Sequence, residues 1–214
     1  MPLLHQAFHL GPLDNNTYVL ACERTREAAV IDVGFEPEVV IRAVRAAGFT
    51  VSHLLNTHAH YDHAAGMRTA QEALGGAYAL HPADRFLLDH LTQQGAAFGF
   101  PEALAPEVVN DVVDGQEIGI GDLVLRVLHT PGHSPGGVCF VLGDDVWVGD
   151  TLFAGSVGRT DLPGGSFPEL ERSIRTRIFP LGDRCRVWTG HGPATTIGHE
   201  RLNNPLVGER ARFA

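Results

Sequence analysis

The sequence has no lysine and an excess of acidic residues, and both features exclude classes of function. All 16 basic residues are arginine, so a mechanism that forms a Schiff base on lysine is excluded. The formal net charge is -9, and an acidic chain without a basic cluster is poorly suited to binding a phosphate backbone. We therefore expect no nucleic acid among its partners.

Cysteine and long apolar segments are also scarce. Cys22, Cys139 and Cys185 show no CxxC spacing, which argues against a disulfide framework and a thiolate zinc site. Each lies in an apolar stretch, so we expect buried structural residues. No segment reaches the roughly 18 apolar residues of a membrane span, and no signal-peptide pattern opens the chain. The prediction is a cytoplasmic protein without a membrane partner.

The 214 residues, 44% of them hydrophobic, predict one domain over residues 1–214. The order is β-rich, βα, β-rich and βα again, which predicts an α/β fold with a four-layer αββα sandwich. The polar turn 23–27 predicts a hairpin. Expected strands are 17–22, 28–32, 51–58, 78–81, 123–129, 137–142, 146–148 and 185–189, and expected helices are 37–47, 60–74, 83–94, 167–179 and part of 198–214.

The most informative segment is NTHAHYDHAAG, residues 56–66. It places His58, His60, Asp62 and His63 within six positions, after an apolar strand and before a helix. Side chains alternate between the two faces of a strand, so His58 and His60 point to the same side. Asp62 and His63, at the start of the helix, then face a second position nearby where a ligand could bind. Imidazole and carboxylate ligands suit Zn²⁺ or Fe²⁺. A helix cap would need only one aspartate.

Further candidate ligands follow later strands. His133 lies in the turn TPGHSPG, Asp150 follows the strand 146–148, and His191 follows the strand ending at residue 189. A single aspartate after a strand is more often a cap, but the ordered set at strand exits indicates a metal centre. The remaining histidines are interpreted as core or surface residues: His5, His9, His53, His81, His90, His129 and His199.

The motifs HAHYDH, PGHSPG, GDTLF and GHGP resemble those of the metallo-β-lactamase superfamily, in particular its glyoxalase II-like branch. The resemblance extends from about Asn15 to Pro205. It implies one metal on His58, His60 and His133, a second on Asp62, His63 and His191, and Asp150 bridging them. It also implies two divalent ions per chain, with zinc favoured and iron or a mixed iron–zinc pair as alternatives.

Two metals would hold a hydroxide that attacks a carbonyl carbon, with Asp62 close enough to orient it. The expected substrate is a small-molecule thioester such as S-D-lactoylglutathione. In the segment GSVGRTD, Arg159 matches a basic residue that binds glutathione in the family, and an ion pair with Asp161 is the alternative interpretation. The chain resembles the short bacterial members that lack the carboxy-terminal helical domain, and Thr160-Asp161 stands where an aromatic residue is expected.

Two other functions remain open at this point. GRTD also occurs in the persulfide dioxygenases of the superfamily, which use one Fe²⁺ on residues matching His58, His133 and Asp150. Lactonases and β-lactamases share the metal motif as well. The sequence leaves the native metal, the acyl group and the oligomeric state undetermined.

Overall fold

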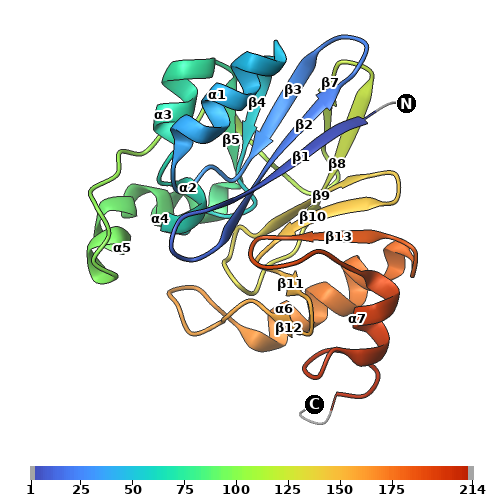
Figure 1. Cartoon of the computed structure of the whole chain (residues 1–214). Helices are drawn as coiled ribbons and strands as arrows, with labels where there is room; N and C mark the ends of the chain where they lie inside the picture. The colour runs from blue at the N-terminus through green and yellow to red at the C-terminus, as the bar shows by residue number, and fades with distance from the viewer. Residues whose placement is uncertain (1–2, 212–214) are drawn as a thin grey trace.

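The protein, described by a computed structural model over residues 3–211, consists of two six-stranded sheets with helices on their outer faces (Figure 1). The first sheet runs in chain order: β1 (Leu3–Leu10), β2 (Asn15–Cys22), β3 (Glu27–Ile31), β4 (Thr50–Leu55), β5 (Ala77–Leu80) and β6 (Asn110–Asp111). The second has the order β14 (Thr195–Thr196), β13 (Arg186–Thr189), β10 (Asp145–Gly149), β9 (Val138–Leu142), β8 (Leu123–His129) and β7 (Glu117–Ile120). A small ribbon pairs β11 (Leu152–Phe153) with β12 (Ser156–Val157).

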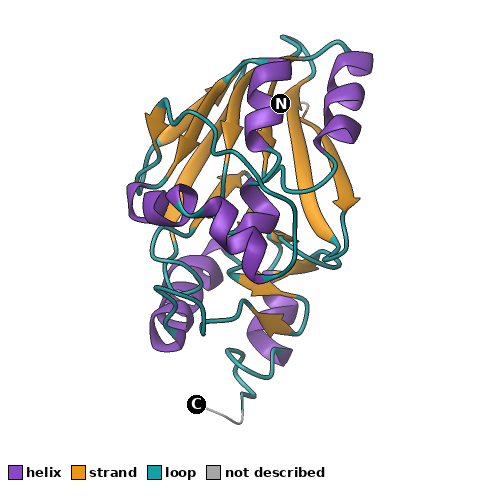
Figure 2. Cartoon of the chain, turned by 90° about the vertical axis from the view of Figure 1, so that its left-hand side faces the viewer, coloured by secondary structure: helices purple, strands orange, loops and turns teal. Residues whose placement is uncertain are grey.

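The helices cover the two outer faces, as the turned view in Figure 2 also shows. Those of the first half are α1 (Pro37–Ala47), α2 (Tyr61–Ala64), α3 (Met67–Leu74), the 3-10 turn η1 (Pro82–Asp84), α4 (Arg85–Asp89) and α5 (Leu91–Ala97). Those of the second half are α6 (Phe167–Ser173), the π turn η2 (Ile174–Ile178), the 3-10 turn η3 (Phe179–Leu181) and α7 (Ile197–Asn203). Among residues 3–211, no helix has the length and apolar character needed to cross a membrane.

Three apolar cores separate four layers, which confirms the predicted αββα sandwich. Val30 of β3 packs with Val44 and Met67 under the helices α1 and α3. A second core, including Leu55 and Trp147, lies between the two sheets. A third core joins β10 and β13 to α6, η2 and α7. Each large side chain so buried stabilises the fold by about 1.5–3 kcal/mol.

Parallel pairing directs several strand ends to one edge. β3, β4 and β5 are parallel neighbours, and β10 is parallel to β13. The predicted hairpin at the turn 23–27 is confirmed, because β2 pairs antiparallel with β3. A second antiparallel pair joins β9 to β10. All three cysteines are buried and free, as predicted. The loops that leave the parallel strands therefore meet at the same edge of the sandwich.

Several predicted boundaries were wrong. The helix 60–74 is two helices, because the Gly66 N–H donates to Val33 O and turns the chain at the break. The helix 83–94 is divided into η1, α4 and α5, with His90 outside the helical region at φ -107°. The helix 167–179 passes into the π turn η2. The sequence did not predict β1, which pairs with β2 over its whole length. The helix predicted within residues 198–214 is α7, and residues 212–214 lie outside the described part of the chain.

Candidate metal centre

Four of the predicted metal ligands lie just beyond strand β4. His58 and His60 occupy the loop after the strand, and Asp62 and His63 lie in the first turn of α2. Asn56, Thr57 and His58 are buried although the strand has ended, so this loop runs through the interior. Gly34 makes the close approach possible, because a Cβ on it would lie 1.6 Å from the carbonyl oxygen of Asp62.

The other three predicted ligands come from the second sheet. His133 lies in the loop between β8 and β9, Asp150 directly follows β10, and His191 lies just beyond β13. Gly190 admits the Asp150 carboxylate, since a Cβ on this glycine would lie 2.1 Å from Asp150 Oδ1. The structure thus brings all seven predicted residues to one edge of the sandwich.

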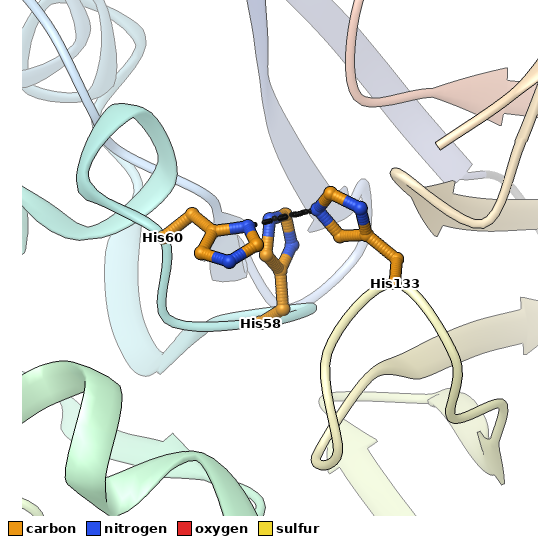
Figure 3. Close-up of side chains that lie close together, drawn as sticks. All are labelled: His58, His60 and His133. Carbon is orange, nitrogen blue, oxygen red and sulfur yellow. Dashed lines mark hydrogen bonds between the residues drawn. The ribbon is translucent and has the colours of Figure 1, made fainter. Parts of the chain in front are cut away.

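Three histidines form the first cluster. His60 Nδ1 lies 2.8 Å from His133 Nε2, which lies 3.2 Å from His58 Nε2. Figure 3 shows the three rings turned toward one another, with His58 and His60 on one loop and His133 on the facing loop. Burial, with a smaller contribution from neighbouring histidines, lowers the pKa of His58 well below its ordinary value and that of His60 to about 3. The rings of His58 and His60 are therefore neutral and present lone pairs to a cation.

Asp62, His63 and His191 form the second cluster, and Asp150 connects the two. His191 Nε2 lies 3.1 Å from Asp62 Oδ2 and 3.2 Å from His63 Nε2. In each cluster, one ligand atom from each member lies within 4.8 Å of the others. Asp150 Oδ1 lies 3.3 Å from His63 Nε2, and Asp150 Oδ2 lies 3.6 Å from His133 Nε2. One carboxylate therefore contacts both clusters.

The donor set fits metal ions. His60 Nε2 and Asp150 Oδ1 are buried without a hydrogen-bond partner among the described residues, a costly arrangement for polar atoms unless a further group binds them. Burial lowers the pKa of His63, but Asp150 and Asp62 outweigh it and raise this pKa well above its ordinary value. The carboxylates thus favour a positive charge at this place, which is what a divalent cation supplies.

Asp32, which the sequence did not single out, contacts the second cluster through His63. Its buried carboxylate accepts hydrogen bonds from the Thr57 N–H at 2.8 Å and the Asn56 side chain at 2.9 Å, and it lies 3.0 Å from His63 Nδ1. Asp32 has a left-handed backbone with φ 57°. The only indication of Asp32 in the sequence is its place at the end of an apolar strand. An aspartate that begins a turn occupies the same place, so the pattern does not distinguish the two roles.

Asp84 joins the two loops that carry the first cluster, and it too was missed. Its carboxylate accepts from Ala59 N at 3.1 Å, Ser134 Oγ at 2.7 Å and Gly136 N at 2.5 Å. The side chain is fully buried. Because Ala59 lies between His58 and His60, and Ser134 follows His133, this one residue fixes the distance between the loops.

A hollow of about 490 Å³ lies over the cluster and is lined by His60, Asp62, His133, Asp150 and His191 together with Leu13, Phe98 and Arg159. Arg159 forms the ion pair given above as its alternative interpretation, with both contacts to Asp161 at 2.7 Å. The Arg159 side chain is 53% exposed, so its guanidinium also remains open to a ligand in the hollow. Within residues 3–211, none of the seven other histidines belongs to a group of three or more close side chains that could hold a metal ion.

Two relatives resemble the chain over most of their length. A hydroxyacylglutathione hydrolase, GloC, of Haemophilus influenzae is 35% identical over 191 residues, which are 87% of this chain and 90% of the relative. A probable metallo-hydrolase, YqgX, of Bacillus subtilis is 31% identical over 92% of this chain and 94% of its own.

Solved structures agree with the fold. BLEG-1, a B3 metallo-beta-lactamase, superposes with a TM-score of 0.88 at 35% identity, covering 95% of this chain and 99% of its own. TTHA1623 in a di-iron-bound form gives 0.86 at 38% identity, covering 94% and 98%. ETHE1 from Myxococcus xanthus gives 0.78 at 28% identity, covering 95% and 84%. The family model of the metallo-beta-lactamase superfamily matches residues 10–191, and the chain belongs to this superfamily.

Proposed function

We propose that the protein is a two-metal hydrolase that cleaves thioesters, with a glutathione thioester such as S-D-lactoylglutathione as the substrate class. The observation that carries the proposal is the contact of one carboxylate, Asp150, with both His63 and His133. Two-metal hydrolytic sites hold their ions about 3.5–4 Å apart, a separation that one shared carboxylate can bridge. The similarity to a hydroxyacylglutathione hydrolase supports the choice of substrate.

The seven residues divide into two ligand sets that share one member. His58, His60 and His133 would hold one ion, Asp62, His63 and His191 the other, and Asp150 both. When bound, two divalent ions bring the pKa of a water molecule toward neutrality and polarise a carbonyl oxygen. Zinc suits these ligands and is favoured, and an iron or iron–zinc pair is the alternative. The di-iron form of TTHA1623 supports a pair of ions and keeps iron in consideration.

The surrounding chain orients the ligands. His133 Nδ1 donates to the carbonyl oxygen of Arg159 at 2.7 Å, and His191 Nδ1 donates to that of Leu13 at 2.8 Å. Both bonds leave Nε2 free to face the cluster. Asp62 borders the hollow and is 17% exposed, so we assign it the role of orienting the attacking water. Arg159 is assigned to a carboxylate of glutathione.

Two other activities are the alternatives. The segment GRTD fits a persulfide dioxygenase with one iron on His58, His133 and Asp150. The similarity to BLEG-1, a B3 metallo-beta-lactamase, favours testing β-lactam hydrolysis as well. The buried histidines and carboxylates alone fit all three activities.

The test is a substrate panel on one preparation. Protein stripped of metal with a chelator is reconstituted with Zn²⁺ or, anaerobically, with Fe²⁺, and each form is assayed on S-D-lactoylglutathione, glutathione persulfide and a chromogenic β-lactam. We expect metal-dependent hydrolysis of the thioester and loss of this activity in Asp62→Asn. Activity on the persulfide or the β-lactam without thioester hydrolysis would contradict the proposal.

A further inference from the structure

A second hollow, of about 450 Å³, adjoins the one over the metal cluster. His60, Gln94, Phe98 and Leu162 line both hollows. The second hollow therefore begins at one of the proposed metal ligands, His60. Its size falls within the range of about 300–1,000 Å³ that small-molecule sites have.

The lining of this second hollow is predominantly apolar. Six of its wall residues carry apolar side chains, and among residues 3–211 no carboxylate or arginine contributes to it. Its polar side chains are imidazoles and amides of His60, His90, Gln93 and Gln94. A charged group placed here would lose hydration without finding an opposite charge. The apolar residues are Phe86, Leu87, Ala97, Phe98, Leu162 and Pro163.

Large apolar side chains are exposed around these hollows. Phe98 is 57% exposed, Leu13 47% and Phe86 40%, and each lines one or both of them. Exposed apolar groups gathered at a depression mark a surface that a ligand covers.

Hydrogen bonds join the wall of the second hollow to the loop that carries His58 and His60, called the metal loop below. Gln94 Nε2 donates to the carbonyl oxygens of Ala59 at 3.1 Å and Leu87 at 2.7 Å, and its Oε1 accepts from the Tyr61 N–H at 3.2 Å. Gly95 packs against the Tyr61 ring, since a Cβ on it would lie 2.5 Å from that ring. Helix α5 therefore holds a fixed position beside His60, and Figure 1 shows it next to α4 on the side of α2.

We propose that this hollow binds the acyl group of the substrate, so that the preferred thioesters carry an apolar acyl chain longer than lactoyl. The inference rests on the proposed thioester hydrolysis. Arg159 lines the hollow over the metals but not the second one. The charged thiol portion has its partner at Arg159, and the apolar portion that remains is the acyl group.

The test is kcat/KM for glutathione thioesters of one straight-chain series: acetyl, butanoyl, hexanoyl and octanoyl. We expect a rise of about threefold to fourfold for each methylene that enters the hollow, levelling off when it is filled. In Phe86→Ser, the hexanoyl-to-acetyl ratio should fall by about tenfold. The control Leu104→Ser removes another exposed apolar side chain, one that lines neither hollow, and should keep the ratio.

A ratio of two substrates on one sample is independent of the folded and metal-loaded fraction. Hydrolysis of all thioesters without dependence on chain length would overturn this inference and leave the proposed function intact. An equal fall of the ratio in both variants would also overturn it. Absence of hydrolysis with every thioester would overturn the proposed function, and this inference with it.

Discussion

His63 donates its Nδ1–H to the carboxylate of Asp32 at 3.0 Å, and both side chains are buried. The bond leaves Nε2 of His63 to face the carboxylates of Asp62 and Asp150. Asp32 also accepts a hydrogen bond from Thr57 Oγ1 at 2.7 Å. A residue outside the ligand set thus selects the nitrogen that the second cluster uses.

We predict that Asp32→Asn weakens metal binding by roughly 10–100-fold, the usual effect of removing a partner that orients a ligand. The asparagine side chain has an N–H donor in place of one carboxylate oxygen, and this donor would face the N–H and O–H groups that Asp32 accepts from. Competition with a chromogenic chelator measures the affinity. Asp122→Asn is the control, because the carboxylate of this partly exposed residue bonds to Arg24 and Cys22 and to none of the predicted ligands within the described residues. Equal affinities in the two variants would show that Asp32 does not orient His63.

Asp84→Asn should reduce the free energy of unfolding by about 1–3 kcal/mol, because at least one of three buried donors loses its acceptor. The donors are Ala59 N, Ser134 Oγ and Gly136 N. Urea unfolding of the metal-free variants measures the change. Asp111→Asn is the matched control, since its pair with Arg85 is exposed. A loss no larger than that of the control would count against the role of Asp84 in joining the loops.

Arg159→Gln should raise KM for S-D-lactoylglutathione by about 10–100-fold, the value of a hydrogen-bonded charge contact. The KM for an uncharged thioester should stay unchanged, because it offers no carboxylate. Arg172→Gln, which removes an exposed arginine paired with Glu169, serves as the control. Steady-state kinetics on both substrates give the two KM values. An equal rise of KM on both would mean that Arg159 only holds the loop.

The thiols of Cys139 and Cys185 should resist alkylation in the native protein. Burial raises the pKa of each to about 11, so about one thiol in a thousand is ionised at pH 8. The raised pKa also makes the free energy of unfolding depend on pH. The stability that the buried, protonated thiol contributes is complete below the ordinary pKa of 9.0 and is lost as the pH rises through about 11. Mass spectrometry after iodoacetamide treatment gives the extent of labelling, with urea-unfolded protein as the positive control. Rapid native labelling of these two residues would be inconsistent with their burial.

The meeting of seven side chains could be predicted because each follows a strand, and the ends of parallel strands share an edge. Local sequence carries that information, as in the spacing of His58, His60, Asp62 and His63. Asp32 and Asp84 could not be predicted, since a lone acid acquires its role only from donors that lie 24 or more residues away.

The sequence pattern also could not predict where the long helices are interrupted. Apolar spacing from residue 60 to 74 favours one helix, but Gly66 bonds to Val33 in a distant strand end and divides it. Strand β1 has mostly half-buried residues and no clear alternation. The hollow beside His60 depends on how α4 and α5 pack on the metal loop, and no motif encodes that.

The central claim is that two metal ions on these seven residues carry thioester hydrolysis. The most direct measurement is elemental analysis of anaerobically purified protein, with S-D-lactoylglutathione hydrolysis and oxygen uptake on glutathione persulfide followed on the same sample. About two metals per chain, hydrolysis of the thioester and no oxygen uptake are the predicted result. One iron per chain with oxygen consumption on the persulfide would contradict the account and identify the protein as a dioxygenase.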